Sequence, residues 1–380
     1  MPKAKPPIED EAEVVIAPGE AVEDVDEEKE VIPYRYSLTA YGADYPVDAL
    51  VKRLEAKDIL VPTFEPEVPV DDAHPGFQRQ FIWTRIQCER FIESLLLGLP
   101  VPGIFLVKQR DGKLMVLDGQ QRLRTLQAYL KGILRGTEFR LESVQDKYKH
   151  KVYEDLDPED RRRLDDSIIH ATIMRQDEPV DDQSSIYLVF ERLNSGGTSL
   201  SPQEIRVALH RGNFARLLRD LNSNSSWRAL FGPKSTRLKD QEMILRFFAL
   251  YLWSDNYASP MKDFLNRYMG RNADCAVHSE AYLTQLFAKT MDLTLSTFGP
   301  RAFYLKSTVN AAVLDSVSVG VAAVIENAKG PISTERLKLA YDELLLNPTY
   351  LKGVRWATAN AENVKSRLSQ SKNAFLSSVS

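Results

Sequence analysis

Cysteine is scarce in this sequence of 380 residues. Cys88 and Cys275 lie far apart and outside any Cys-x-x-Cys spacing. They provide neither a disulfide framework nor a cysteine-based metal site, and they suit a reducing cytoplasm. The five histidines form no His-Glu-x-x-His motif, which excludes a zinc hydrolase of that type.

Several other signatures are missing. No apolar run reaches about 18 residues, so no membrane span is predicted. The first residues hold no apolar signal core, so we expect a cytoplasmic protein rather than a secreted one. The sequence contains neither Gly-x-x-x-x-Gly-Lys-Ser/Thr nor Gly-x-Ser-x-Gly, which excludes a P-loop nucleotidase and a serine hydrolase of the elbow type.

Negative charge is concentrated at one end. Residues 1–32 hold eleven acids and three lysines, a balance of −8, and since the formal charge of the chain is −4 the remainder carries +4. The acidic segment is predicted to be a disordered tail. We favour a solvated tail over one that covers a basic groove. The weakly basic remainder permits a nucleic-acid partner without requiring one.

The ordered part of the chain is predicted to begin with helices and strands in alternation. We expect a helix over 47–57, a short strand over 59–61 and a helix opened by the capping-box pattern Thr84 to Gln87. The apolar runs 104–107 and 114–117 flank Asp111-Gly112, which predicts a hairpin.

Further elements follow to residue 212. The pattern predicts strands over 138–144 and 168–174 and helices that start at Asp157, over 182–193 and after Ser201. From Asn213 onward strand signals vanish, and helices are predicted at 239–253, 260–269, 279–297, 307–328, 333–346 and 360–371.

These elements predict an α+β fold in three parts. Residues 1–32 would be the acidic tail, residues 33–212 a mixed N-terminal domain and residues 213–380 an all-helical domain. The long helical part makes self-association plausible, but its apolar residues are more simply explained as core.

The segment from Asp118 to Arg122, Asp-Gly-Gln-Gln-Arg, lies between an apolar strand and a helix. Gly119 lets backbone approach a ligand, and a helix start offers N–H groups to an anion. With Arg122 and Arg124 nearby, these are the components of a phosphate site. An equally good interpretation is a capping box between Asp118 and Gln121, which would occupy the same N–H groups.

Two other segments combine polar and aromatic residues. Arg79, between aromatic residues in 74–83, could contact a phosphate or stack on Trp83. The stretch 190–200, with Asn194, Gly196 and Gly197, could be a helix C-cap, but Glu204 and Arg206 crowd the next helix start.

In this order, the three segments resemble the DUF262 family, the ParB/sulfiredoxin-like module of GmrSD-type modification-dependent restriction enzymes. The resemblance covers roughly residues 70–250. It rests on Gln78-Arg79-x-Phe81-x-Trp83, on Asp-Gly-Gln-Gln-Arg, and on Phe190-x-x-x-Asn194-x-Gly196-Gly197-x-x-Leu200 followed by Glu204 and Arg206. A less distinctive match lies around 237–246.

The resemblance implies a ParB/sulfiredoxin-like domain that binds a nucleoside triphosphate (NTP) and Mg²⁺, with hydrolysis that gates a nuclease in a restriction or phage-defence system. The residues implied for catalysis are Asp118, Gln120, Gln121 and Arg122, with Asp118 also as the metal ligand. Those expected to bind nucleotide are Arg79, Gly119, Arg124, Asn194, Gly196, Gly197, Glu204 and Arg206.

The chain departs from DNA-cutting relatives, which carry or accompany an HNH-type nuclease domain. Residues 250–380 contain one histidine, His278, without HNH-like surroundings. We therefore expect a regulatory subunit that needs a separate nuclease. Two other functions stay open, a non-catalytic ParB-like DNA-binding module and a nucleotide-free interaction protein.

Overall fold

The computed structural model describes residues 22–23, 37–62, 83–109, 111–178, 184–193 and 200–379. By packing, the chain divides into two compact units. One, the sheet unit, comprises Glu27–Arg219 and Trp253–Thr284. The other, the helical unit, comprises Met1–Asp26, Asp220–Leu252 and Gln285–Ser380.

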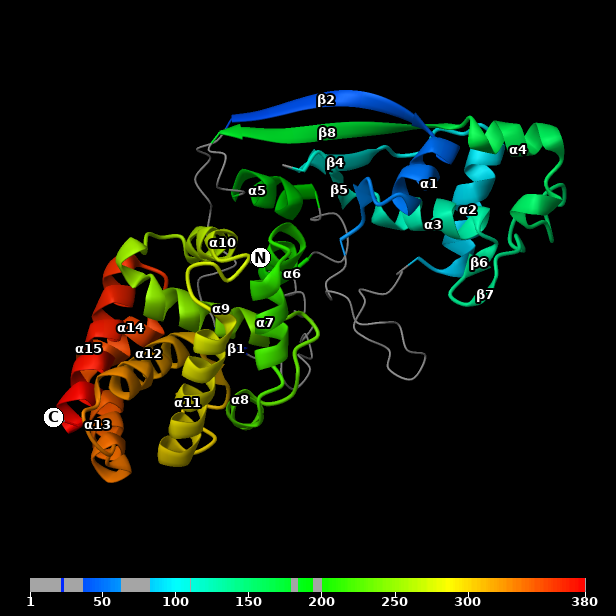
Figure 1. Ribbon diagram of the computed structural model, residues 1–380. Helices are drawn as coiled ribbons and strands as arrows, with labels where there is room; N and C mark the ends of the chain where they lie inside the picture. The colour runs from blue at the N-terminus through cyan, green and yellow to red at the C-terminus, as the bar shows by residue number, and fades with distance from the viewer. Residues whose placement is uncertain are drawn as a thin grey trace, which may run out of the picture. The chain divides into compact units, whose positions relative to one another are not determined.

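A mixed five-stranded sheet organises the sheet unit, in the order β2-β8-β4-β5-β3. The long strands β2 (Ser37–Pro46) and β8 (Ile168–Glu178) are antiparallel and run side by side in Figure 1. β4 (Ile104–Lys108) lies parallel to β8 and antiparallel to β5 (Leu114–Asp118). The short β3 (Ile59–Leu60) is parallel to β5.

Both faces of the sheet are buried at β5, which explains the unbroken apolar run of this strand. Leu114 and Val116 belong to one core cluster, and Met115 and Leu117 to another. Successive strand residues point to opposite faces, so a strand covered on both sides reads as a continuous hydrophobic run.

Different helices cover the two faces. The first face packs on α1 (Val47–Glu55), α2 (Arg85–Leu96), α3 (Gln120–Leu130) and α4 (Pro158–Asp165), and Figure 1 shows the first three grouped together. The second face packs on α5 (Ser184–Leu193) and α6 (Pro202–Leu209). α7 (Asn213–Leu221) follows, and α10 (Met261–Arg271) is joined to α6 by a buried hydrogen bond from Arg206 to Asn266.

Several local predictions are confirmed. Thr84 and Gln87 form the capping box that starts α2. The β4–β5 hairpin turns at Asp111-Gly112, where Gly112 has φ +84°. Ser201 and Glu204 form a second capping box at the start of α6.

The strand expected over 138–144 is wrong beyond its first residue, since only Thr137–Glu138 pair, as β7, with β6 (Ile133–Leu134). Phe139 and Leu141 are buried at alternate positions, as in a strand. The backbone of Leu141, however, exchanges hydrogen bonds with the turn at 150–151 instead of a neighbouring strand. An apolar residue at every second position cannot distinguish a strand paired in a sheet from an extended segment bonded to a turn.

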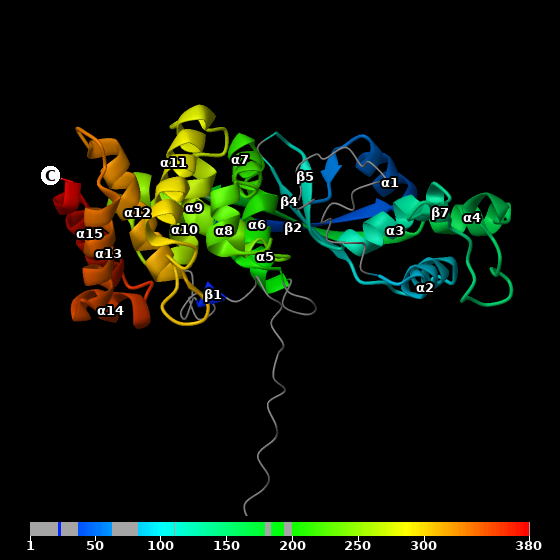
Figure 2. The same ribbon diagram turned by 90° about the horizontal axis from the view of Figure 1, so that it is seen from below.

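All six helices expected after residue 213 are present. Five of them belong wholly or partly to the helical unit: α9 (Lys239–Leu252), α11 (Glu280–Phe298, shared with the sheet unit), α12 (Ala311–Asn327), α13 (Thr334–Leu346) and α15 (Ala361–Val379). The sixth, α10, belongs to the sheet unit. Figures 1 and 2 show α12, α13 and α15 packed together. The sequence interpretation missed three short helices: α7, α8 (Ser225–Phe231) and α14 (Pro348–Arg355).

Most of the predicted disordered tail, residues 1–32, lies outside the described residues. Val22–Glu23 are an exception, because they form β1, which pairs in parallel with β9 (Val309–Asn310). The prediction of disorder is therefore wrong at these two residues. The same pairing corrects the expectation that strands end before residue 213.

The fold class is confirmed as mixed, with a sheet in the N-terminal part of the chain and helices in the C-terminal part. Among the described residues, no helix combines the length and apolarity needed to cross a membrane.

A buried charge cluster joins three helices of the helical unit. Asp315 on α12 accepts hydrogen bonds from Arg246 of α9, with Nη2 to Oδ2 at 2.7 Å, and from Arg367 of α15, with Nη2 to Oδ2 at 3.0 Å. None of the three side chains is more than 2% exposed. Asp315 thus compensates two guanidinium groups that have little access to water.

We expect Asp315→Ala to lower the free energy of unfolding by about 3–5 kcal/mol, because removing one partner leaves buried charge uncompensated. Urea denaturation followed by circular dichroism would measure this loss. Asp342→Ala, which removes an exposed partner of Lys338 on α13, should cost no more than about 0.5 kcal/mol. Equal effects of the two substitutions would contradict a stabilising role for the cluster.

Candidate functional site

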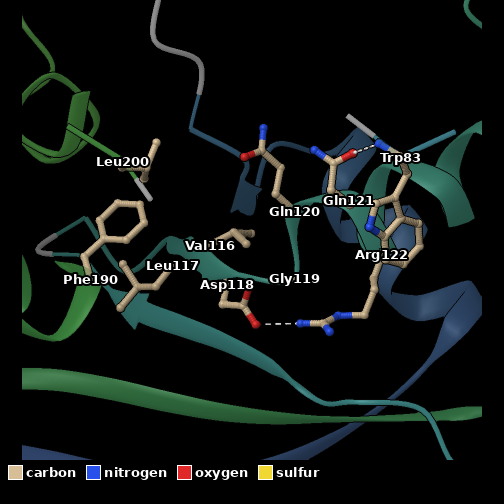
Figure 3. A pocket seen from close by; sticks show the side chains of 10 residues that line it. All are labelled: Trp83, Val116, Leu117, Asp118, Gly119, Gln120, Gln121, Arg122, Phe190 and Leu200. Atoms are coloured by element: carbon tan, nitrogen blue, oxygen red, sulfur yellow. Dashed lines mark hydrogen bonds and ion pairs between the residues drawn. The ribbon is translucent and has the colours of Figure 1, made fainter. Parts of the chain in front are cut away.

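A pocket lies at the carboxyl end of β5, where α3 begins. It is lined by Trp83, Val116, Leu117, Asp118, Gly119, Gln120, Gln121, Arg122, Phe190 and Leu200. Figure 3 shows Gln120 and Gln121 along one side and the Asp118–Arg122 pair along another, with Phe190, Leu117 and Leu200 at one end and Trp83 at the other. All ten residues belong to the sheet unit.

The sheet topology places the pocket here. β3 and β5 are parallel, so their carboxyl ends meet at one edge of the sheet. In sheets with parallel strands, ligands bind beyond such ends because the following loops and helix starts converge there. The amide nitrogen of Gln120 donates to the carbonyl of Pro62, which joins the two chain segments that leave this edge, at 3.3 Å.

Gly119 is required at the turn from β5 into α3. Its φ is +97°, and a Cβ atom there would lie 2.4 Å from Cγ2 of Ile104 on the neighbouring strand β4. Gly119 is also the N-cap of α3, and no side chain caps the helix there. The capping-box interpretation of Asp118 and Gln121 is therefore wrong, and the first turn of α3 faces the pocket without a side-chain cap.

The two side chains proposed for capping have other partners. Asp118 Oδ2 accepts a hydrogen bond from Arg122 Nη2 at 2.6 Å, and the two side chains are 43% and 13% exposed. The side-chain amide oxygen of Gln121 accepts a hydrogen bond from the backbone N–H of Trp83 at 3.4 Å. Arg122 retains a buried Nε–H for which the described residues supply no acceptor.

An apolar wall completes the pocket. Phe190 comes from α5 and Leu200 from the residues before α6, and both belong to the core cluster that holds Leu117. Phe190 and Leu200, from the third motif segment, therefore lie close to the Asp118–Arg122 segment because they pack on the same face of the sheet as Leu117. Trp83, from the first segment, packs edge-on against Phe91 of α2 with ring centroids 5.5 Å apart.

The structure does not bring all expected residues to this pocket. Arg79, Asn194, Gly196 and Gly197 lie outside the described residues. Glu204 instead caps α6, where its carboxylate accepts from the backbone N–H of Ser201.

Arg206 is fully buried and bonds to Asn266 and Gln203, with its guanidinium over the ring of Tyr187. Arg124 lies one turn beyond Gln120 on α3 and is not a lining residue of the pocket. Burial lowers the pKa of Arg124, which indicates a cation in partly desolvated surroundings.

Sequence reasoning assigned no binding role to the apolar lining residues Val116, Leu117, Phe190 and Leu200. The sequence analysis interpreted Val116 and Leu117 as core residues of a strand. It used Phe190 and Leu200 only as positions of the family motif. For Val116 and Leu117, their position in the sequence could have indicated a binding role. The last residues of a strand that precedes a glycine turn lie at the edge of any site formed there.

Among the described residues, no cluster of three His, Cys, Asp or Glu side chains could hold a metal ion. Of the described residues that line this pocket, Asp118 is the one carboxylate. Mg²⁺ is commonly bound by one or two carboxylates together with the phosphates of a substrate. The donor set therefore fits Mg²⁺ that arrives with a nucleotide, and it does not fit a metal site made of protein ligands alone.

Residues 70–211 match the family model described as GmrSD restriction endonuclease, N-terminal domain. This match confirms the resemblance to the GmrSD-type DUF262 family, and the matched segment holds all lining residues of the pocket. No curated protein matches the chain.

We expect Gly119→Ala to lower the free energy of unfolding by about 2–5 kcal/mol, since it combines an unfavourable positive φ with overpacking against Ile104. Gly112→Ala is the matched control, because Gly112 has φ +84° with open space around it. The control should lose about 1–2 kcal/mol. Chemical denaturation would compare them, and equal losses would show that the contact with Ile104 does not constrain the turn.

Proposed function

Because residues 70–211 match the N-terminal domain of GmrSD restriction endonucleases, we propose that this chain is a nucleotide-dependent component of a restriction or phage-defence system. In this proposal the pocket at the start of α3 binds an NTP with Mg²⁺ and hydrolyses it. Nucleotide turnover then regulates a nuclease.

The observation that carries the proposal is the set of groups at the start of α3. The helix start lacks a side-chain cap, and Gly119 brings backbone to the cavity. Arg122 also lines the cavity, and its buried Nε–H has no acceptor among the described residues. Helix N-termini and arginine forks both bind phosphate oxygens, through N–H dipoles and paired hydrogen bonds. Each group supports an anion as the ligand.

The opposite side of the pocket supports a ligand with an apolar part as well. Phe190, Leu200 and Leu117 present carbon surface across from the polar side chains of Gln120 and Gln121. Ligand sites are usually built this way, with apolar walls and a few polar groups that fix orientation. A nucleotide has both properties, a flat base and a charged phosphate chain.

The two glutamines have different partners, which suggests different roles. Gln121 uses its side-chain amide oxygen to accept from the backbone N–H of Trp83, so it positions Trp83 beside α3. The hydrogen bond of Gln120 uses its amide nitrogen, which leaves the carbonyl oxygen to accept from a water molecule. We assign water orientation to Gln120, because positioning supplies much of the catalysis in phosphoryl transfer.

Asp118 and Arg122 would exchange partners when nucleotide binds. In the structure, Arg122 Nη2 donates a hydrogen bond to Asp118 Oδ2 at 2.6 Å. With ligand present, Arg122 would contact phosphate oxygens, and Asp118 would be released to hold Mg²⁺ directly or through water. Mg²⁺ bound in this way would neutralise charge on the phosphate groups.

We expect Arg122→Gln to weaken NTP binding about ten- to one-hundred-fold, which corresponds to one charge-assisted contact of about 1.5–3 kcal/mol. Isothermal titration calorimetry with Mg²⁺ and a non-hydrolysable triphosphate analogue would measure the change. Arg162→Gln, on the exposed side of α4, removes the same charge and should bind as wild type. Unchanged affinity in Arg122→Gln would contradict the phosphate role.

Gln120→Ala and Gln121→Ala should separate turnover from binding. We expect Gln120→Ala to lower kcat about ten-fold or more with a dissociation constant near that of wild type. The reason is that Gln120 orients the attacking water and does not bind the nucleotide itself. Gln121→Ala should weaken binding instead, since it releases Trp83. Phosphate-release kinetics together with calorimetry would test this assignment, and the reverse pattern would exchange the two roles.

We also propose that DNA cleavage belongs to a separate nuclease that this chain regulates. Purified protein with Mg²⁺ and nucleotide should leave plasmid DNA intact, as judged by agarose gel. If wild type and Asp118→Ala nick the plasmid equally well, the proposed division of labour is wrong.

A further inference from the structure

A second basic position lies beside the pocket, at the end of β3. Arg211 follows α6, and its Nη2 donates to the carbonyl of Val61 at 3.2 Å. The neighbouring carbonyl, of Pro62, accepts from Gln120 Nε2 at 3.3 Å. Arg211 and the pocket residue Gln120 are therefore attached to consecutive residues of one segment, although 91 positions of sequence separate them.

Arg124 lies on the face of α3 that carries Gln120. It is four residues beyond Gln120 on α3, so the two side chains share one helix face. Lys131, seven residues further, is on this face too and pairs with Glu55 at the end of α1 at 3.3 Å. This face of α3 thus looks toward α1 and the end of β3, where Arg211 is anchored.

Neither guanidinium has a compensating acid among the described residues. Within the described part of the chain, Lys131 has Glu55 and Arg122 has Asp118, but no carboxylate pairs with Arg124 or Arg211. Burial lowers the pKa of both arginines, and no charged neighbour offsets it. Arg124 is half-buried and Arg211 is exposed, and two such cations near one chain segment without an acid partner form a favourable site for an anion.

The bond to Val61 does not account for the whole side chain of Arg211. It uses one of five guanidinium N–H groups, and Arg211 remains exposed at the surface. A contact with one carbonyl fixes the direction of the side chain and leaves the other donors for a ligand. The planar fork of guanidinium donors matches phosphate oxygens.

We propose that Arg211 and Arg124 bind a phosphate group of the nucleotide that extends past Gln120 toward the end of β3. This inference rests on the proposed function of the pocket. It assigns a binding role to Arg211 that the sequence motifs do not, and it specifies which part of the nucleotide the two arginines contact. The affinity of the site would increase with the number of phosphate groups, so the triphosphate would bind more tightly than the monophosphate.

Calorimetry with a matched phosphate series tests the proposal. ATP, GTP, CTP and UTP are first titrated into wild-type protein with Mg²⁺. The base that binds most tightly is then used as monophosphate, diphosphate and imido-triphosphate, which cannot be hydrolysed. The variants are Arg211→Gln, Arg124→Gln and the control Arg216→Gln, which removes the same charge from an exposed arginine that pairs with Glu280.

We expect Arg211→Gln and Arg124→Gln each to weaken binding of the imido-triphosphate about ten- to one-hundred-fold, as for the loss of one charge-assisted contact. Binding of the monophosphate should change by less than about two-fold, and Arg216→Gln should bind every ligand as wild type does. Arg211→Lys should recover only part of the loss, because an ammonium lacks the paired donors.

Two results would overturn the inference in distinguishable ways. If wild type binds nucleotide and Arg211→Gln binds the whole series equally well, Arg211 is not a phosphate ligand, while the proposed function of the pocket stands. If wild type binds none of the nucleotides, the inference and the proposed function both fail.

Discussion

The contact between Gly119 and Ile104 is the constraint on which the site depends. β4 approaches the end of β5 so closely that a Cβ atom at Gly119 would overlap Ile104, and the positive φ at the same residue turns the chain directly into α3. A side-chain cap is excluded at this position because the N-cap residue is glycine. The first turn of the helix therefore faces a cavity, beside the Asp118–Arg122 pair.

The double-sided sheet determines which parts of the chain meet in that cavity. Alternate residues of β5 contact two separate cores, so α3 is held against one face while α5 and α6 are held against the other. The pocket lies at the edge where both layers end. For this reason it has a polar side built from α3 and an apolar side built from Phe190 and Leu200.

Charge pairing distinguishes supporting residues from those available to a ligand. Asp315 and Arg206 are fully buried with partners from other helices, so they stabilise the fold. Arg122 has one partner and an unsatisfied donor, and Arg124 and Arg211 have no acid partner within the described residues. Sequence position alone would not separate these arginines, because Arg206 and Arg211 are five residues apart on the same stretch of chain.

Local patterns in the sequence determined the elements and the centre of the site: the hairpin at Asp111-Gly112, the capping boxes at Thr84 and Ser201, and the strand-turn-helix at Gly119. Each depends on interactions within a few residues, which a sequence records directly. Only the tertiary structure showed that Asp118 pairs with Arg122 and does not cap α3, and that Glu204 and Arg206 bond to groups that support the fold. It also attached Arg211 and Gln120 to consecutive residues of one segment. Those outcomes depend on which elements pack together across long separations, and residue type and spacing do not encode that directly.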